Sequence, residues 1–467
     1  MRITARPPCW QGIKDLRLTG TLWIGGGVQR FDRSVKSEMI PAKIPTVYSA
    51  NYVRYVVGML SLVYLVNLTD RQIMAILMQP IKQEMQLSDT ELGFLGGIAF
   101  AIFYSVLGMP IARLADKHSR VNILTICLIL WSVMTAFCGL AQNFWQLLAA
   151  RIGVGVGEAG GSPPSHSLIA DYVPVEGRST ALGIFAIGVP LGLLSGYLLG
   201  GWIEQYYGWR VAFLALGLPG VVLALIVRYS LDEPPRGHSQ GGVKEQAPTP
   251  SVMEVVRHMW RVPTFWHLSL ATALQAFATY SIYQWMPSFL ARSYHMQSGE
   301  IGLWLSLVIG VGGIIGTFSG GYLADLFSRR DMRWQMWIPA ISILLTAPFC
   351  VGIYISGGPV WSLIFLFFPM ILVNTWLGPG FAVTQTLAPV RMRVMASALL
   401  LFVLNIIGLG LGPQAVGIMS DVLQPAHGQE SLRYALLISS SFYLWSAYHF
   451  WKAAATLRED LEQAIER

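Results

Sequence analysis

The chain has 467 residues, of which 54% are hydrophobic and only 12% are charged, and its formal net charge is +7. Soluble proteins carry roughly 25% charged residues, so this composition excludes an ordinary water-soluble enzyme, a disordered chain and a nucleic-acid binder with a basic surface. A helix that crosses a bilayer needs about 20 apolar residues, and the chain is long enough for twelve. We therefore expect an integral membrane protein that lies in the lipid bilayer and has no nucleic-acid partner.

Residues 1–50 differ in composition from the rest of the chain. Four basic residues lie between Arg2 and Arg17, but no apolar run of the length of a signal-peptide core follows them, so we expect no secretory signal peptide. The glycines at 25–27, with Pro41 and Pro45, predict a basic, poorly ordered extension, to which we assign no function.

Twelve apolar runs follow Arg54, and each is long enough to cross a bilayer as a helix. They lie at 52–78, 91–113, 121–141, 144–170, 178–201, 209–230, 264–290, 299–323, 334–356, 360–388, 394–420 and 434–452. A polar interval separates the first six from the last six. We therefore expect an all-α membrane protein with twelve transmembrane helices in two pseudo-symmetric six-helix halves. The expected parts are an N-terminal extension (1–50), an N-terminal bundle (51–231), a cytoplasmic linker (232–262), a C-terminal bundle (263–455) and a tail (456–467).

Two helix starts can be predicted from capping residues. Ser88 and Glu91 form the pattern of a capping box at the start of the second span. Ser251 and Glu254 repeat the pattern in the linker, before apolar residues that predict an amphipathic helix on the membrane surface.

Lys and Arg residues gather on one side of the expected bundle. After the first span, 17 of them fall on the side of the two termini, against four on the other side, Lys82, Arg210, Arg292 and Arg433. Cytoplasmic loops carry an excess of Lys and Arg, so we expect both termini to be cytoplasmic. A bacterial inner membrane suits this arrangement, and an organellar membrane is the alternative.

A short motif recurs at the same place in each half. Leu114-Ala-Asp116-Lys117-His-Ser-Arg120 lies between spans 2 and 3, and Leu323-Ala-Asp325-Leu-Phe-Ser-Arg329-Arg330 lies between spans 8 and 9. Duplicated halves are typical of transporters that bind substrate where the halves meet. We expect the charged residues of the two loops to act as a conformational latch: Asp116, Lys117, Arg120, Asp325, Arg329 and Arg330. The alternative is positive-inside charge with a chance match.

The repeated loop resembles the cytoplasmic signature of the major facilitator superfamily, Gly-x-Leu-Ala-Asp-Arg-x-Gly-Arg-Arg. Ala112 replaces the first glycine of this signature, and Leu326 replaces a basic residue in the second copy. The resemblance covers residues 52–455 and implies the major facilitator fold and a transport function.

A narrower resemblance points to the spinster branch of that superfamily. Its motifs are Asn67-Leu-Thr-Asp70-Arg71, Arg151-Ile-Gly-Val-Gly-Val-Gly-Glu158-Ala159, Leu168-Ile-Ala-Asp171 and Glu233-Pro-Pro-Arg-Gly237. This resemblance implies export of lysolipids or sphingolipids, or efflux of other compounds, in several members linked to protons.

Four ionisable residues lie well inside the spans, all in the N-terminal half: Asp70, Arg71, Arg151 and Glu158. Such residues are functional candidates by default because charge is costly in a bilayer. We expect Glu158 to pair with Arg71 in one state and separate in another, and Asp70 to pair with Arg151. A carboxylate that moves between a dry site and an arginine changes its proton affinity.

We therefore assign proton coupling to Glu158, Arg71 and Asp70, with Glu158 as the proton carrier and Arg71 as its switch or as anchor for an anionic headgroup. A static ion pair between spans 1 and 4 is the alternative, and we expect Arg151 to be structural rather than catalytic.

The C-terminal spans carry no Asp, Glu, Lys or Arg away from their ends. A cavity that is charged on one wall and apolar on the other suits an amphipathic substrate. We expect the substrate to contact Arg71, Glu158, Arg151, Tyr280, Tyr283, Gln284, Asn374 and Asn405. The alternative is that the Tyr, Gln and Asn side chains only bond helix to helix.

These patterns predict a secondary transporter, and the expected partners are an amphipathic lipid-like substrate or an organic anion, protons and the lipid bilayer. The scattered cysteines and the lack of a Walker loop predict no metal site, no cofactor and no ATP-driven pump. We expect no enzyme activity and a monomer. The alternatives are a carrier of a small solute, such as a drug, sugar or carboxylate, and a non-transporting membrane sensor.

Overall fold

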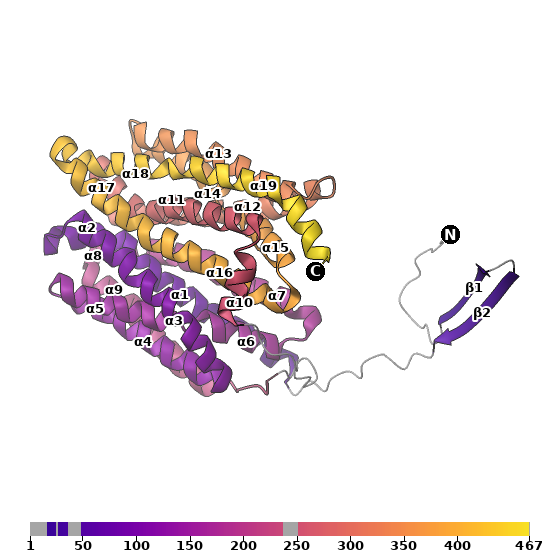
Figure 1. Cartoon of the computed structure of the whole chain (residues 1–467). Coiled ribbons are helices and arrows are strands. Elements are labelled where there is room, and N and C mark those ends of the chain that lie inside the picture. Colours follow the sequence, from indigo (N-terminus) through magenta and orange to yellow (C-terminus); the bar gives the residue numbers. More distant parts are fainter. Residues whose placement is uncertain (1–15, 25–26, 36–47, 237–250, 467) are drawn as a thin grey trace. The chain divides into compact units, whose positions relative to one another are not determined.

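The computed structural model describes residues 16–24, 27–35, 48–236 and 251–466 (Figure 1). The chain divides into two units, Met1–Ser49 and Ala50–Arg467, and each is described by itself. The rest of the expected extension and residues 237–250 of the linker lie outside the described residues.

The first unit contains a β-hairpin that the sequence reasoning did not foresee. Strands β1 (Leu16–Ile24) and β2 (Gly27–Val35) pair antiparallel, with Leu16 opposite Val35 and Ile24 opposite Gly27. We expected poor order throughout 1–50, and for these two segments that expectation was wrong. The physical reason is visible in the sequence, because residues with high strand propensity, among them Leu22, Trp23, Ile24 and Val28, lie on both sides of a run of glycines.

The second unit is built from helices. The N-terminal half consists of α1 (Ala50–Met85), α2 (Asp89–Gly96), α3 (Ile98–Lys117), α4 (Arg120–Leu140), α5 (Phe144–Glu158), α6 (Ser162–Tyr172), α7 (Val175–Ala186), α8 (Gly188–Tyr207) and α9 (Trp209–Ser230). The linker contributes α10 (Val252–Met259). The C-terminal half consists of α11 (Pro263–Tyr294), α12 (Ser298–Ser328), α13 (Trp334–Ile355), α14 (Pro359–Leu372), α15 (Leu377–Leu387), η2 (Val390–Met392), α16 (Arg393–Leu404), the π-helical η3 (Asn405–Leu411), α17 (Gly412–His427), η4 (Gly428–Glu430), α18 (Ser431–Ser440) and α19 (Phe442–Glu466).

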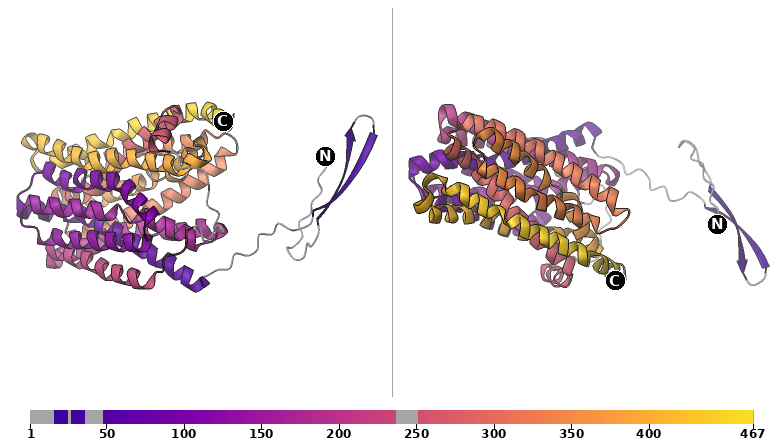
Figure 2. Two further views of the ribbon diagram at one scale, coloured as in Figure 1. Left: turned by 60° about the horizontal axis from the view of Figure 1, so that its bottom comes forward. Right: turned by 90° about the horizontal axis from the view of Figure 1, so that it is seen from above.

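Figures 1 and 2 show α1–α9 gathered on one side of this unit and α11–α19 on the other, with long helices running side by side. Nine segments of the described residues are long and apolar enough to cross a membrane, and the last of these, Val390–Ala464, contains two expected spans. Two further expected spans are formed by α5 with α6 and by α11. The fold is therefore that of a twelve-span, all-α membrane protein with two six-helix halves.

Both predicted helix starts are present. The Ser88 hydroxyl accepts a hydrogen bond from the Glu91 N–H (3.1 Å), and the Glu91 carboxylate accepts one from the Ser88 N–H (2.8 Å). In the linker, the Ser251 hydroxyl caps α10 by accepting from the Glu254 N–H at 3.2 Å.

Helix α10 turns one face to the protein and the other outward. Val255 and Met259 are buried, whereas Met253 and Trp260 are exposed. Such two-sided exposure is typical of a helix at a membrane interface, so the surface position of α10 stays a prediction that this geometry supports.

The two ends of the helical unit differ in their polar contacts. We call the end that holds the connection between α1 and α2 the Asp89 end, and the end that holds the connection between α3 and α4 the Arg120 end. At the Arg120 end, Arg120 is 1% exposed. It donates hydrogen bonds to Glu233 (2.7 Å) and the Pro234 carbonyl (2.8 Å) and pairs with Asp171. The start of the linker is thereby fastened to the N-terminal half.

Acidification is expected to weaken the contacts that hold the start of the linker to the N-terminal half. Burial raises the pKa of Glu233, but hydrogen bonds from the Val121 N–H, Arg120 and Ser119 outweigh it and hold that pKa below its usual value. A carboxylate whose pKa falls on folding stabilises the fold above its unfolded pKa of about 4.3, and this contribution is lost as the pH falls through the folded-state pKa.

Thermal unfolding in detergent between about pH 6 and pH 3 should therefore show a smaller loss of stability for Glu233→Gln than for the wild type. Glu254, whose side chain is exposed, offers the control, and Glu254→Gln should follow the wild-type curve. A Glu233→Gln curve parallel to the wild type would contradict the prediction.

Candidate functional site

An ion pair joins α1 to the end of α5. Arg71 donates from Nε (2.9 Å) and from Nη2 (2.8 Å) to the same carboxylate oxygen of Glu158. The Glu158 side chain is fully buried, and 15% of the Arg71 side chain is exposed. Glu158 is the last residue of α5, and the chain turns through Gly160 and Gly161 before α6 begins. The contact that the sequence suggested for one state is present in this structure.

Asp70 and Arg151 are also buried, but the structure does not bring them into contact. Within the described residues, no ion pair joins the two side chains. Arg151 donates weakly to the Leu95 carbonyl (3.4 Å), and its guanidinium carbon lies 5.4 Å from the centre of the Phe100 ring. Asp70 lies within electrostatic range of Glu158 and Arg151. All four ionisable residues thus belong to one buried cluster, with only one direct pair.

Aromatic rings surround Arg71, and the sequence reasoning did not include them. The guanidinium carbon lies 4.5 Å from the centre of the Tyr104 ring and 4.9 Å from that of Phe100. Tyr64, which lies two turns before Arg71 on α1, stacks on Phe185 with ring centres 4.5 Å apart. Cation–π contacts of this kind stabilise a guanidinium away from water. The spacing of Phe100 and Tyr104 places both on one helix face, but only the packing shows that this face turns to Arg71.

Two of the expected substrate contacts in the C-terminal half lie opposite this cluster. Tyr280 and Tyr283 are half-buried on α11, with ring centres 6.1 Å apart. Tyr280 lies within electrostatic range of Arg71. Asn374 is half-buried, lies close to Tyr283, and donates its amide hydrogen bond to the Met370 carbonyl at 2.7 Å. These side chains keep part of their surface accessible, as residues that line a binding space must.

Gln284 and Asn405 are placed differently. Gln284 is 9% exposed, and its amide contacts the Met78 sulfur at 2.8 Å. A Cβ atom on Gly96 would come within 2.5 Å of that amide, so Gln284 fills a close contact between the halves. Asn405 is half-buried and is the first residue of the π-helical η3, a geometry found frequently at functional sites.

Most of the residues expected to form a latch at the Arg120 end form no ion pair with another described residue. Asp116, Lys117, Asp325, Arg329 and Arg330 are exposed, and none of them forms an ion pair with another described residue. Only Arg120 is bound, and its partners belong to its own half and the linker.

The side-chain hydrogen bonds that link the two halves lie on the other side of the molecule. Among the described residues, all of them fall between the level of Arg71 and the Asp89 end. They connect α1, α2 and α8 with α11, α12 and α17. The halves are therefore bonded to each other at the Asp89 end and not at the Arg120 end.

Two helical halves that enclose a buried ion pair and are bonded at one end define a membrane transport protein. The family model of the Major Facilitator Superfamily matches residues 60–413. An "MFS-type efflux pump" of Mycolicibacterium smegmatis is 34% identical over 412 residues, which cover 87% of this chain and 93% of that protein. The chain belongs to the major facilitator superfamily, and within it to the spinster-like branch.

Two further comparisons bear on the branch. The sphingosine-1-phosphate transporter of Xenopus tropicalis is 26% identical over 432 residues, covering 87% of this chain and 82% of that protein. A crystal structure of a bacterial homologue of the human lysosomal transporter Spinster, inward-facing and unoccupied, is similar with a TM-score of 0.82 and 30% identity. It covers 88% of this chain and 99% of that one. As a member of this family, the protein is a multi-pass membrane transporter and not an enzyme.

Proposed function

We propose that this transporter moves an amphipathic, lipid-like substrate or an organic anion by alternating access, coupled to protons through Glu158. The observation that carries the proposal is the buried pair of Arg71 and Glu158, set among half-buried tyrosines. The N-terminal half contributes the charged pair, and the C-terminal half contributes the half-buried Tyr280, Tyr283 and Asn374. A charged or phosphorylated headgroup suits the charged pair, and an apolar tail suits the C-terminal half, whose spans carry no charged side chains away from their ends.

Proton coupling follows from competition for Arg71. While Arg71 binds Glu158 with two hydrogen bonds, the guanidinium favours the charged form of the carboxylate. An anionic headgroup that takes over the guanidinium releases Glu158, which then binds a proton because an unpaired charge is costly in a buried site. Asp70, buried beside Glu158, provides a second carboxylate for the same exchange. Arg151, two turns earlier on α5, contributes a second buried positive charge to the cluster.

The names of the relatives are consistent with a lipid-like substrate, but they do not identify one substrate class. One similar protein is named a sphingosine-1-phosphate transporter, whereas another is named an efflux pump. A small-solute carrier is therefore the second candidate, and a non-transporting sensor that kept the fold is the third.

We also propose an orientation and a state. The excess of Lys and Arg on the side of the termini supports a cytoplasmic position of the Arg120 end, and this arrangement suits a bacterial inner membrane. With the Asp89 end bonded and the Arg120 end unbonded, the protein is inward-facing, like the similar Spinster homologue. A single chain supplies both walls of the site, which fits a monomer.

The proposal is tested in liposomes that contain the purified protein and a trapped pH dye. A gradient of lysolipid, and in separate samples of small organic anions, is the only driving force. We expect substrate-dependent proton movement for the wild type and at least about a tenfold loss in Glu158→Gln, since the carboxyl proton carrier is removed.

Glu300, exposed at the start of α12, gives a matched control, and Glu300→Gln should keep the wild-type rate. Equal transport by wild type and Glu158→Gln without a proton signal would refute the coupling. Competition by small solutes but not by long-chain lipids would favour the second candidate, and no transport of any compound would favour the sensor.

A further inference from the structure

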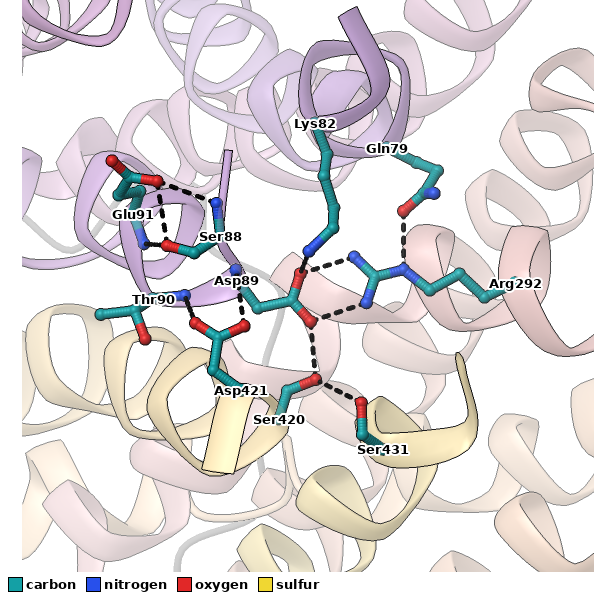
Figure 3. A network of polar contacts seen from close by, with 10 residues as sticks. All are labelled: Gln79, Lys82, Ser88, Asp89, Thr90, Glu91, Arg292, Ser420, Asp421 and Ser431. Atoms are coloured by element: carbon teal, nitrogen blue, oxygen red, sulfur yellow. Dashed lines mark hydrogen bonds and ion pairs between the residues drawn. The ribbon is translucent and has the colours of Figure 1, made fainter. Parts of the chain in front are cut away.

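Asp89 is the centre of a polar network that crosses between the two halves (Figure 3). Its carboxylate accepts hydrogen bonds from Lys82 of α1 (2.6 Å), from both terminal nitrogens of Arg292 of α11 (2.7 Å each) and from Ser420 of α17 (2.6 Å). The Nε of Arg292 also donates to the Gln79 side chain of α1 at 2.7 Å. Arg292 thus reaches from the C-terminal half into the space between α1 and α2. Asp89 is 2% exposed.

A second carboxylate crosses the same boundary in the opposite direction. Asp421 of α17 accepts hydrogen bonds from the N–H groups of Asp89 (3.0 Å) and Thr90 (2.7 Å) at the start of α2. Ser88 already binds the N–H of Glu91, so the C-terminal half completes the capping of a helix that belongs to the N-terminal half. The positive end of the helix dipole favours a carboxylate at this place.

The backbones of the two halves are also in close contact beside this network. A Cβ atom on Gly417 of α17 would lie 2.3 Å from the Asp89 carbonyl oxygen, and one on Gly93 of α2 would lie 2.8 Å from that of Pro413. Glycine at both positions lets α2 and α17 approach until the polar groups meet.

The distribution of charge singles out this network. Of the four basic residues on the sparsely charged side, Arg210 and Arg433 pair with acidic residues of their own halves. The remaining two, Lys82 and Arg292, both bind Asp89.

We propose that Asp89, Arg292 and Asp421 form the latch that holds the Asp89 end of the transporter closed, and that its strength sets the balance between the two access states. The inference rests on the proposed alternating access. Opening of the Asp89 end separates Asp89 from Arg292 and Ser420 and withdraws Asp421 from α2. The freed groups border a cavity of about 750 Å³ that is lined by Lys82, Asp89, Arg292 and Asp421 among others. Water can solvate them there, so the latch is reversible.

The latch can be tested by distances between paired spin labels in the purified full chain. One pair of cysteines replaces the exposed Gln83 of α1 and Gln424 of α17 at the Asp89 end, and a second pair replaces the exposed Arg113 and Leu326 near the Arg120 end. The native cysteines of the described residues are buried, and Cys9 is replaced by Ser. Distances are recorded without substrate at one pH.

For Arg292→Gln and for Asp421→Asn we expect the population with a long distance at the Asp89 end to rise about tenfold, because charge-assisted hydrogen bonds are lost only from the closed state. The Arg120-end pair should shorten in parallel. Arg292→Lys keeps the charge but not the bidentate contact. Its population with a long distance at the Asp89 end should therefore lie between those of the wild type and Arg292→Gln.

The control is Arg210→Gln, which removes an ion pair at the same end but within the N-terminal half, and it should leave both distance distributions unchanged. Wild-type distances in both test variants would overturn the latch, as would an equal change in the control. These distances do not depend on transport, so the result stands apart from the Glu158 experiment. Loss of proton coupling in Glu158→Gln together with wild-type distances in the latch variants would refute the latch alone.

Discussion

Replacing Arg71 by alanine is expected to lower the free energy of unfolding by about 3 to 5 kcal/mol, the usual effect of removing one partner from a buried ion pair. Glu158 is fully buried and receives both of its hydrogen bonds from Arg71, so the variant leaves it without a donor. The cation–π contacts with Phe100 and Tyr104 are lost as well. Unfolding in mixed detergent micelles measures the change.

A double variant separates loss of the pair from loss of packing. Arg71→Met with Glu158→Leu removes both charges at similar volume, and it should recover most of the lost stability while transport stays abolished. Arg210→Ala breaks a partly exposed pair and should cost less than about 1 kcal/mol. If the double variant were as unstable as Arg71→Ala, an uncompensated carboxylate would not be the cause.

The second large effect is expected from a single methyl group in the C-terminal half. A Cβ atom on Gly316 of α12 would lie 2.0 Å from the Ile371 carbonyl oxygen and 2.8 Å from its carbon. Both are backbone atoms of α14, so they cannot turn away as a flexible side chain can. Gly316→Ala should therefore push α12 and α14 apart and destabilise the protein by about 2 to 3 kcal/mol.

Gly321 on the same helix is the matched control, because a Cβ atom there would meet nothing within 4 Å. Gly321→Ala should change the free energy of unfolding by less than about 0.5 kcal/mol. Equal melting behaviour of the two variants would show that α12 and α14 do not need their close approach.

Much of the architecture could be predicted from the sequence because helix spans in a bilayer are defined by local composition. The expected run at 264–290 lies within α11 and that at 334–356 nearly coincides with α13. Ser88 and Glu91 marked the start of α2 because capping is a contact between residues three apart. The hairpin of β1 and β2 was missed, because the glycines, prolines and basic residues of this region suggested a poorly ordered extension.

The candidate site was predicted in part. Buried charge is rare enough in a membrane span that Arg71 and Glu158 could be named from the sequence, and they form the direct pair. The partner of Arg151 could not be predicted, because helix position gives depth and face but not which side chain reaches across. For the same reason Tyr104, which lies over Arg71, was not distinguished from other aromatic residues of the spans.

By itself, the sequence determined the membrane location, the succession of helices and the residues whose burial needs a functional reason, since all of these depend on local hydrophobicity and charge. Only the tertiary structure decided which end of the transporter is closed. Asp89, Arg292 and Asp421 lie far apart in the chain and in ordinary polar positions near helix ends, and they become a network only where α2, α11 and α17 meet. The energy of that contact depends on distances between the two halves, which no local pattern records.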